Sequence, residues 1–239
     1  MKPKVLVYVP CHNNKEFIRE CLDSALSQTY SKQEIVVSFN GCDDGVDLLV
    51  AKEYPMVRTL HYKPFNKIMN PGINEALKTT DCEVYMQLPS DDKMVKGYWE
   101  EVLPLFEEDI GFIRIGLYQF SEKLPEGSHW KPFPLIIPEE ILEYNKIFHS
   151  SPIRKVVWES VGGYDPKQPI FGDWDFWIKA ILIHKWKWKD LDKPLVWYRR
   201  HEKAESYNYD QSTNGTPYLM MKKKYKYLTE HYGGPSSLR

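Results

Sequence analysis

From Val5 to Leu88 the chain alternates between short apolar runs and segments with helical periodicity. Strands that are buried on both faces give uninterrupted apolar runs of this kind. When strands alternate with helices, each helix crosses over the sheet between two parallel strands. The pattern therefore predicts an α/β fold with a mostly parallel central sheet flanked by helices. The expected strands are Val5–Val9, Glu34–Phe39, Val57–Tyr62 and Glu83–Leu88, and the expected helices are Glu16–Gln28, Val46–Glu53 and Gly72–Lys78.

The predicted sheet brings three loops to one edge. In a parallel sheet the carboxyl ends of the strands lie on the same side, and ligands bind in the crevice that the following loops enclose. These loops are Pro10–Asn14, Asn40–Gly45 and Pro89–Lys93. After Met94 the alternation weakens, and only a helix at Asp173–His184 and a strand at Leu191–Tyr198 are expected there.

Charge and cysteine usage argue against several classes of protein. Lys plus Arg total 32 and Asp plus Glu total 33, so the net charge of -1 provides no field for a nucleic-acid backbone. The four cysteines lack C-x-x-C spacing, which argues against a structural zinc site or a disulfide framework. No apolar stretch approaches the length of a signal-peptide core or a membrane span, so we expect a cytoplasmic protein. The basic segment Lys222–Tyr227 is a candidate contact to an anionic membrane surface, although a solvated helix end is the simpler interpretation.

Two adjacent carboxylates, Asp91 and Asp92, follow the fourth predicted strand. Mg²⁺ typically takes one or two carboxylates and completes its shell with phosphate oxygens and water. A cation held there would neutralise a diphosphate leaving group. The alternative is that these aspartates cap a helix that starts near Met94.

Further segments occur in an order that closely resembles the family 2 glycosyltransferases. The resemblance covers about Lys4–Ser206, and it implies an inverting enzyme with the GT-A fold, a Rossmann-like nucleotide-diphospho-sugar transferase fold. Such an enzyme moves a sugar from a nucleotide diphosphate donor, UDP in the first instance, to a hydroxyl of a glycan or glycolipid acceptor with Mn²⁺ or Mg²⁺. The segments are Val9–Asn14, Cys21–Tyr30, Glu34–Val37 with Asn40–Gly41, Asn70–Ala76, Ser90–Asp92, Val161–Asp165, Gly172–Trp177 and Tyr198–His201.

The resemblance also implies the residues of the donor site. The second loop of the family usually presents an aspartate to the base, and Asn40 stands there instead, which makes the preference for uracil less secure. Pro89 replaces the first aspartate of the family's metal loop, while Asp91 and Asp92 remain to meet the ribose and the metal. Lys63 also lies near the expected donor. The implied donor contacts are Pro10, Cys11, His12, Asn40, Lys67, Asn70, Ser90 and Asp91.

On the acceptor side, the resemblance places the catalytic base at Asp173. Gly172 would permit close approach of the acceptor, and Trp174 would offer a flat face for a sugar ring. We interpret Asp175 as a first-turn residue that favours the helix dipole, and Trp177 as a core residue rather than a stacking platform.

The strand that ends at Tyr198 is followed by Arg199, Arg200 and His201. The guanidinium groups are candidates for the phosphate oxygens, and alternation along the strand should direct only one of them into the site. His201 is a candidate third metal ligand, as in some relatives of the family, and a lone surface histidine is the competing interpretation.

These assignments divide one continuous domain into a nucleotide-sugar-binding half, residues 1–93, and an acceptor-binding half with a C-terminal extension, residues 94–239. Two other functions stay open. A nucleotidyltransferase would use a similar sheet, but it normally has a Gly-rich basic loop that this chain lacks after the first strand. An inactive sugar- or nucleotide-binding module is suggested by the aromatic content and by Pro89.

Overall fold

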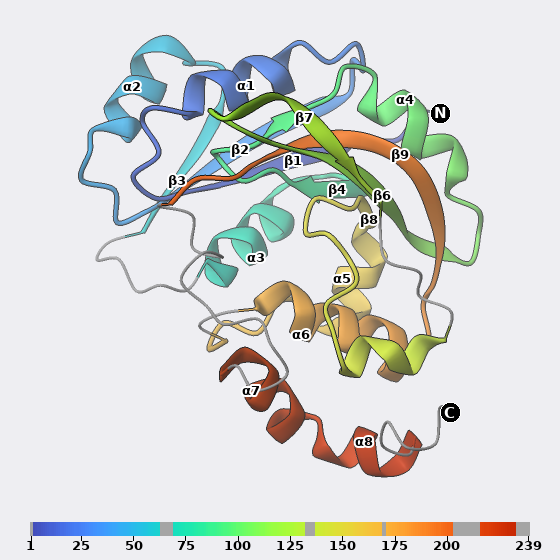
Figure 1. The fold of residues 1–239 in the computed structure, drawn as a ribbon. Helices are drawn as coiled ribbons and strands as arrows, with labels where there is room; N and C mark the ends of the chain where they lie inside the picture. Colours follow the sequence, from blue (N-terminus) through green and yellow to red (C-terminus); the bar gives the residue numbers. More distant parts are fainter. Residues whose placement is uncertain (1, 63–68, 132–136, 169–170, 203–215, 233–239) are drawn as a thin grey trace.

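The computed structural model describes residues 2–62, 69–131, 137–168, 171–202 and 216–232 (Figure 1). In these residues a nine-stranded sheet has the order β3-β2-β1-β4-β8-β6-β9-β5, with β7 paired to β6. The strands are β1 (Val5–Cys11), β2 (Gln33–Asn40), β3 (Arg58–Tyr62), β4 (Val84–Gln87), β5 (Lys93–Met94), β6 (Ile110–Ser121), β7 (Leu124–Trp130), β8 (Ile153–Arg154) and β9 (Lys187–Arg199).

The first part of the sheet confirms the predicted alternation. Strands β3, β2, β1 and β4 are parallel neighbours, and α1 (Ile18–Leu26), α2 (Val46–Glu53) and α3 (Asn70–Thr79) connect them. The register pairs Val7 with Ile35 on one side and with Met86 on the other. The carboxyl ends of β1, β2 and β4 therefore open toward the same edge.

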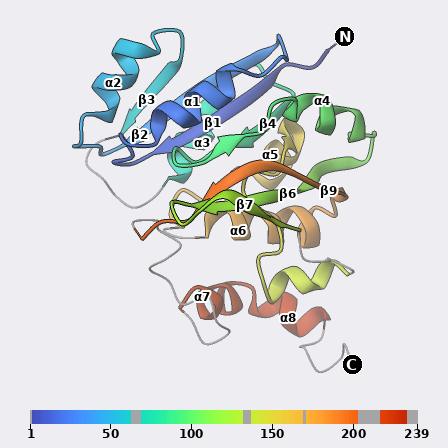
Figure 2. The same cartoon turned by 45° about the horizontal axis from the view of Figure 1, so that its top comes forward.

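The second part of the sheet departs from this pattern. β8 is antiparallel to β4 and to β6, whereas β6 and β9 run parallel over a long register from Ile110–Lys187 to Phe120–Arg199 (Figure 2). The sequence predicted neither β6 nor β7, and β9 begins four residues before the expected Leu191. Glycine inside β6 and a proline inside β9 interrupt the apolar pattern from which strands are usually identified.

The remaining helices are short. They are α4 (Tyr98–Val102), η1 (Leu103–Leu105), η2 (Pro138–Leu142), α5 (Lys155–Val161), α6 (Gly172–Ile178) continued by the π-helical turn η3 (Lys179–Ile183), α7 (Thr216–Lys224) and α8 (Lys226–Tyr232). The alternative interpretation, in which Asp91 and Asp92 cap a helix near Met94, is wrong, because Lys93–Met94 is a strand and the next helix begins at Tyr98. The adjacent aspartates thus need another explanation.

Helices cover both faces of the sheet. Val5, Val7 and Val9 pack with α1 and α2, whereas Leu6 and Tyr8 on the opposite face pack with α3, α5 and α6. Helices α7 and α8 form a further layer against α6 on the side away from the sheet, in both views (Figures 1 and 2). Met221 and Tyr225 of these helical segments belong to the same apolar cluster as α3 and α6. The C-terminal helices are thus part of the packed structure.

The described residues bear on the expected state of the cysteines and on membrane-spanning helices. All four cysteines are free thiols, which agrees with the absence of paired spacing. Among the described residues, none of the helices combines the length and the apolar character that crossing a membrane requires.

Candidate active site

The three loops that the sequence predicted to converge are joined by hydrogen bonds. Asn14 donates from Nδ2 to Oγ of Ser90 (2.8 Å), and the backbone amide of Ser90 donates to the carbonyl of Pro10 (3.3 Å). The Nδ1 atom of His12 lies 2.9 Å from the carbonyl oxygen of Asn40. Because a carbonyl only accepts, this nitrogen of His12 carries the proton. Side chains and backbone groups after β1, β2 and β4 therefore form one continuous surface.

The implied donor residues differ in exposure. Cys11 is completely buried, and Asn40 is almost so, with its Nδ2 atom 2.9 Å from the sulfur of Met69. Asn70, at the start of α3, donates to the backbone carbonyl of Asp165 (2.8 Å). Its amide thus connects the first half of the chain to the loop before α6. Lys63 and Lys67 lie outside the described residues.

Asp91 contacts the end of the chain's last strand. Its Oδ2 atom is 2.9 Å from Nε2 of His201, and its carbonyl accepts a hydrogen bond from Nε of Arg199 (2.8 Å). Pairing of β5 with β9 produces this proximity, since Lys93 lies opposite Trp197. Asp91 and His201, which are far apart in sequence, therefore form a carboxylate–imidazole pair beside the donor loops.

Asp92 is fully buried, and its two oxygens have unequal surroundings. Oδ1 accepts a hydrogen bond from the backbone amide of Arg199 (2.8 Å). Oδ2 receives no hydrogen bond from the described residues and lies 3.7 Å from Nε2 of His149. Burial raises the pKa of Asp92 well above its ordinary value, and the neighbouring charge of Asp91 adds to this effect. A negative charge at Asp92 is consequently costly.

His149 is a site residue that the sequence analysis missed. Burial lowers the pKa of its imidazole, while the carboxylates of Asp173 and Asp91 act in the opposite direction. Its Nε2 atom lies 3.7 Å from Oδ2 of Asp92, so a residue ahead of β8 approaches the loop after β4. A single histidine ahead of a two-residue strand has no spacing signal that would identify it from sequence.

Asp173 lies in the first turn of α6 and is half-buried. Its Oδ2 atom accepts a hydrogen bond from Nδ2 of Asn145 (2.8 Å), another residue that the sequence analysis missed. The amide of Asn145 is itself oriented, because its Oδ1 atom accepts from the backbone amide of Ile147 (3.2 Å). One oxygen of Asp173 is therefore held by an amide that is itself fixed, and its role as the catalytic base stays a prediction.

The residues around Asp173 pack more tightly than expected for an acceptor surface. A β-carbon at Gly172 would collide with the amide of Asn70, so the glycine here permits contact between α6 and α3. Trp174 is 5% exposed and donates from Nε1 to the carbonyl of Ile141 (2.6 Å), and its stacking role stays a prediction. Trp177 is buried, which confirms the core interpretation.

The two arginines at the end of β9, Arg199 and Arg200, have different surroundings. The Arg199 guanidinium lies between the rings of Phe17 and Phe120, 4.5 Å and 4.4 Å from their centroids, and reaches Glu20 at 3.2 Å. Arg200 is exposed, 5.8 Å from the ring centroid of Tyr198. Arg199 thus contacts the Asp91 loop, and a phosphate contact by either arginine stays a prediction.

The charged groups near Asp91 fit a divalent cation. Asp91 and His201 offer a carboxylate oxygen and an imidazole nitrogen that lie 2.9 Å apart. No group of three or more His, Cys, Asp or Glu side chains converges as a preformed metal site in the described residues. Two protein ligands suffice for Mg²⁺ when diphosphate oxygens and water complete the shell.

Comparisons with known proteins identify relatives of this chain. A family model described as glycosyl transferase family 2 matches residues 6–157. A chondroitin synthase of Escherichia coli is 23% identical over 193 residues, which cover 77% of this chain and 27% of that protein. This chain therefore spans only about a quarter of that relative's length.

Two solved structures share the fold. S. aureus TarS 1-349 in complex with UDP-GlcNAc superposes with a TM-score of 0.74 at 17% identity, over 92% of this chain and 65% of that one. The mannosyltransferase PcManGT from Pyrobaculum calidifontis, in complex with GDP-Man and Mn²⁺, superposes with a TM-score of 0.62 at 17% identity, over 87% of this chain and 59% of that one.

Proposed function

Because this chain belongs to glycosyl transferase family 2 and has the GT-A fold, we propose that it transfers a sugar from a nucleotide diphosphate donor to an acceptor hydroxyl, with inversion and with a divalent metal. One observation carries the proposal. The carboxylate of Asp91, after β4, lies 2.9 Å from the imidazole of His201, after β9, so two metal-ligating groups from separate elements meet beside the donor loops. Direct displacement at a sugar carbon needs such a metal site for the diphosphate and a separate carboxylate base for the acceptor, for which Asp173 is the candidate.

On the donor side, Asp91 and His201 would hold Mn²⁺ or Mg²⁺, which supplies positive charge to the departing diphosphate. Asp92 supports this arrangement, because its Oδ1 atom accepts a hydrogen bond from the backbone amide of Arg199 at the end of β9. The guanidinium of Arg199, itself held by Asp91 and Glu20, orients the metal loop against the end of β9. Complexes of structural relatives with UDP-GlcNAc and with GDP-Man and Mn²⁺ support a nucleotide-sugar donor and this metal.

On the acceptor side, Asp173 would take the proton of the attacking hydroxyl. Asn145 holds one oxygen of this carboxylate, so the other is presented in a fixed direction. Positioning of a general base contributes typically about 10²- to 10⁴-fold to a rate. The acceptor would be a glycan or glycolipid, and residues 94–239 would bind it, while residues 1–93 bind the donor.

A thermal-shift panel of UDP-, GDP- and dTDP-sugars, with and without Mn²⁺, tests the proposal. A bound donor raises the melting temperature of the folded protein, and we expect the largest shift with a UDP-sugar and Mn²⁺. Release of free UDP from that sugar then separates a transferase from an inactive binding module. A chain that binds UDP-sugars and releases no UDP would contradict the proposed activity.

A further inference from the structure

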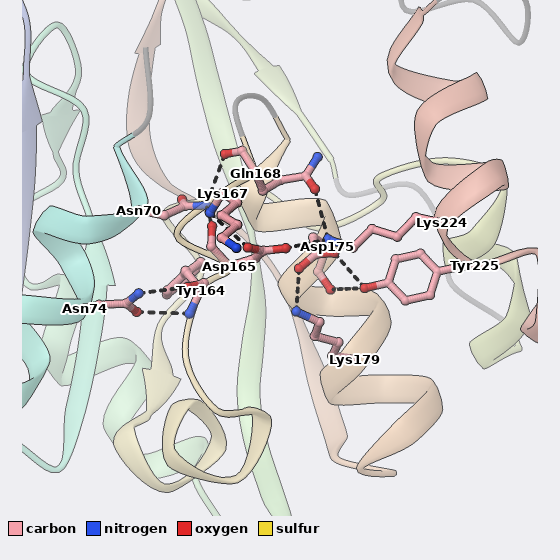
Figure 3. Close-up of polar contacts among 10 residues, drawn as sticks. All are labelled: Asn70, Asn74, Tyr164, Asp165, Lys167, Gln168, Asp175, Lys179, Lys224 and Tyr225. Atoms are coloured by element: carbon pink, nitrogen blue, oxygen red, sulfur yellow. Dashed lines mark hydrogen bonds and ion pairs between the residues drawn. The ribbon is translucent and has the colours of Figure 1, made fainter. Parts of the chain in front are cut away.

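The carboxylate of Asp175 lies wholly inside the protein, two residues after the proposed base (Figure 3). Its Oδ2 atom is 2.7 Å from Nζ of Lys179, one turn further along the helix. Its Oδ1 atom accepts a hydrogen bond from the hydroxyl of Tyr225 (2.6 Å) and lies 2.6 Å from Nζ of Lys224. The sequence analysis attributed only a helix-dipole role to Asp175, whereas the structure surrounds it with cations and a hydroxyl.

Lys224, at the end of α7, uses its whole hydrogen-bonding capacity in this cluster. Its ammonium group lies 2.8 Å from Oδ2 of Asp165, 2.9 Å from Oε1 of Gln168 and 2.6 Å from Oδ1 of Asp175. An ammonium has three N–H groups, so each has one oxygen. The pKa of Asp165 is lowered, chiefly by its hydrogen bond from Lys224. Lys224 therefore joins the loop before α6 to α6 itself.

The same loop is attached to α3. Asn70 donates to the carbonyl of Asp165, and Asn74 exchanges two hydrogen bonds with the backbone of Tyr164, of 2.7 Å and 2.9 Å (Figure 3). Gly172 packs directly on Asn70. The turn that carries Asp173 is thus held from α3 on one side and from α7 on the other.

The backbone of this turn needs such support. Phe171, immediately before Gly172, has φ 55° and ψ 36°, a left-handed conformation that residues with a side chain rarely adopt. Backbone conformations of this kind persist only where contacts with the surrounding structure hold them in place, and they are concentrated at functional sites. The next residues are Gly172 and Asp173, so any relaxation of the turn would move the proposed base.

We propose that Lys224 and Tyr225 are positioning residues for Asp173, and that the C-terminal helix α7 thereby completes the acceptor side of the site. The proposal rests on the proposed transfer function. The contacts are directional and polar, whereas apolar packing alone would stabilise α7 on the core as well or better. Polar contacts at fixed distances specify where α6 sits, and a displacement of about 1 Å at a reacting group costs on the order of a hundredfold in rate.

The test compares Lys224→Met with Lys223→Met, a change of the same chemistry at the adjacent exposed lysine. Release of UDP from a UDP-sugar with Mn²⁺ is measured at a temperature at which both variants are folded, together with the Mn²⁺-dependent thermal shift by UDP. Loss of positioning should lower kcat of Lys224→Met by about tenfold to a hundredfold and leave the shift by UDP intact. Lys223→Met should match the unaltered protein.

Two milder variants cover the case in which Lys224→Met does not fold. Tyr225→Phe removes one hydroxyl from Asp175, and Lys224→Arg keeps the charge; we expect a lower kcat for the first and partial recovery for the second. An unchanged kcat in a folded Lys224→Met or Tyr225→Phe protein would overturn the positioning role. A variant whose UDP binding falls as much as its kcat would overturn it as well. If the unaltered protein itself releases no UDP, the proposed function fails, which is a different result from an active protein that tolerates Lys224→Met.

Discussion

The site contains two pairs of aspartates, Asp91 with Asp92 and Asp173 with Asp175. The two pairs are similar in burial but differ in how the buried charge is compensated. In each pair one carboxylate is partly exposed, Asp91 or Asp173, and a nearby one is fully buried, Asp92 or Asp175. Each buried carboxylate binds a segment from the C-terminal part of the chain. The exposed carboxylates are the ones that a substrate or a metal could reach.

The two buried carboxylates differ in how their charge is compensated. Asp175 has an ammonium group at each oxygen and a tyrosine hydroxyl as well. Asp92 has a backbone amide at one oxygen, and a histidine nitrogen, Nε2 of His149, lies 3.7 Å from the other. A buried charge without a partner is expensive, whereas a paired one is stable in place. The comparison indicates that Asp175 serves the protein scaffold, and the Asp91–Asp92 loop stays the proposed cation site.

The largest effect should follow from changing the exposed member of the second pair. Asp173→Asn keeps the hydrogen bond from Asn145 possible but removes the proton acceptor. We expect kcat for UDP release to fall by about a thousandfold, with donor binding nearly unchanged, because a base acts mainly in the transition state. Steady-state kinetics and the thermal shift by UDP measure the two quantities, with Asp81→Asn as a change at an exposed carboxylate. A large loss of donor binding would place Asp173 on the donor side instead.

The second prediction separates the two buried carboxylates by stability. Asp175→Asn leaves two ammonium groups facing a neutral amide, and we expect a loss of about 3 kcal/mol in the free energy of unfolding. Asp92→Asn keeps an acceptor for the amide of Arg199 and removes a charge that burial disfavours, so the loss should stay below about 1 kcal/mol. Urea denaturation of both variants gives the comparison. Equal losses would mean that Asp92 is compensated as fully as Asp175.

The third prediction concerns the first pair and the metal. Asp91→Asn should weaken Mn²⁺ binding in the presence of UDP by at least about tenfold, because the amide is a poor ligand for a hard cation. Titration followed by the electron paramagnetic resonance signal of free Mn²⁺ reports this without an activity assay. Asp92→Asn is the matched control, with a smaller change expected. If Asp92→Asn weakens binding as much as Asp91→Asn does, the buried carboxylate is a direct ligand.

The sequence predicted the first pair's surroundings better than the second pair's. The strands up to Leu88 follow from local periodicity, and topology alone brings the loops after them together. Asn145, His149 and Lys224 join the site through single contacts between segments far apart in the chain, such as the hydrogen bond from Asn145 to Asp173. Neither periodicity nor spacing encodes such contacts. The family resemblance identified Asp173 and His201 as candidates because it matches residues by position, but it gave no role to the tail after Ser206.

The smallest effect should come from the pH dependence of the contact between Lys224 and Asp165. The contacts with Asp165 and Asp175 raise the pKa of Lys224 despite burial, and those with Lys224 lower the pKa of Asp165. A raised lysine pKa contributes stability that is complete below the ordinary value of 10.5 and is lost at higher pH. A lowered aspartate pKa contributes stability above 3.8 that is lost as the pH falls through the lower, folded-state value. The contribution is therefore complete between about pH 4 and pH 10 and declines outside that window.

Because both side chains are about a third exposed, solvent screens the pair, and its contribution should not exceed about 1 kcal/mol. Because Lys224→Met also removes an ammonium group from the buried Asp175, its melting temperature should lie at least a few degrees below that of the unaltered protein at pH 7, and the part due to Asp165 should be lost below pH 4. Lys223→Met should show no such dependence, since its side chain is exposed. A difference that is the same at pH 3 and pH 7 would assign the stabilising role of Lys224 to packing of its methylene chain, and the electrostatic contrast between Asp175 and Asp92 would then be weaker than the geometry indicates.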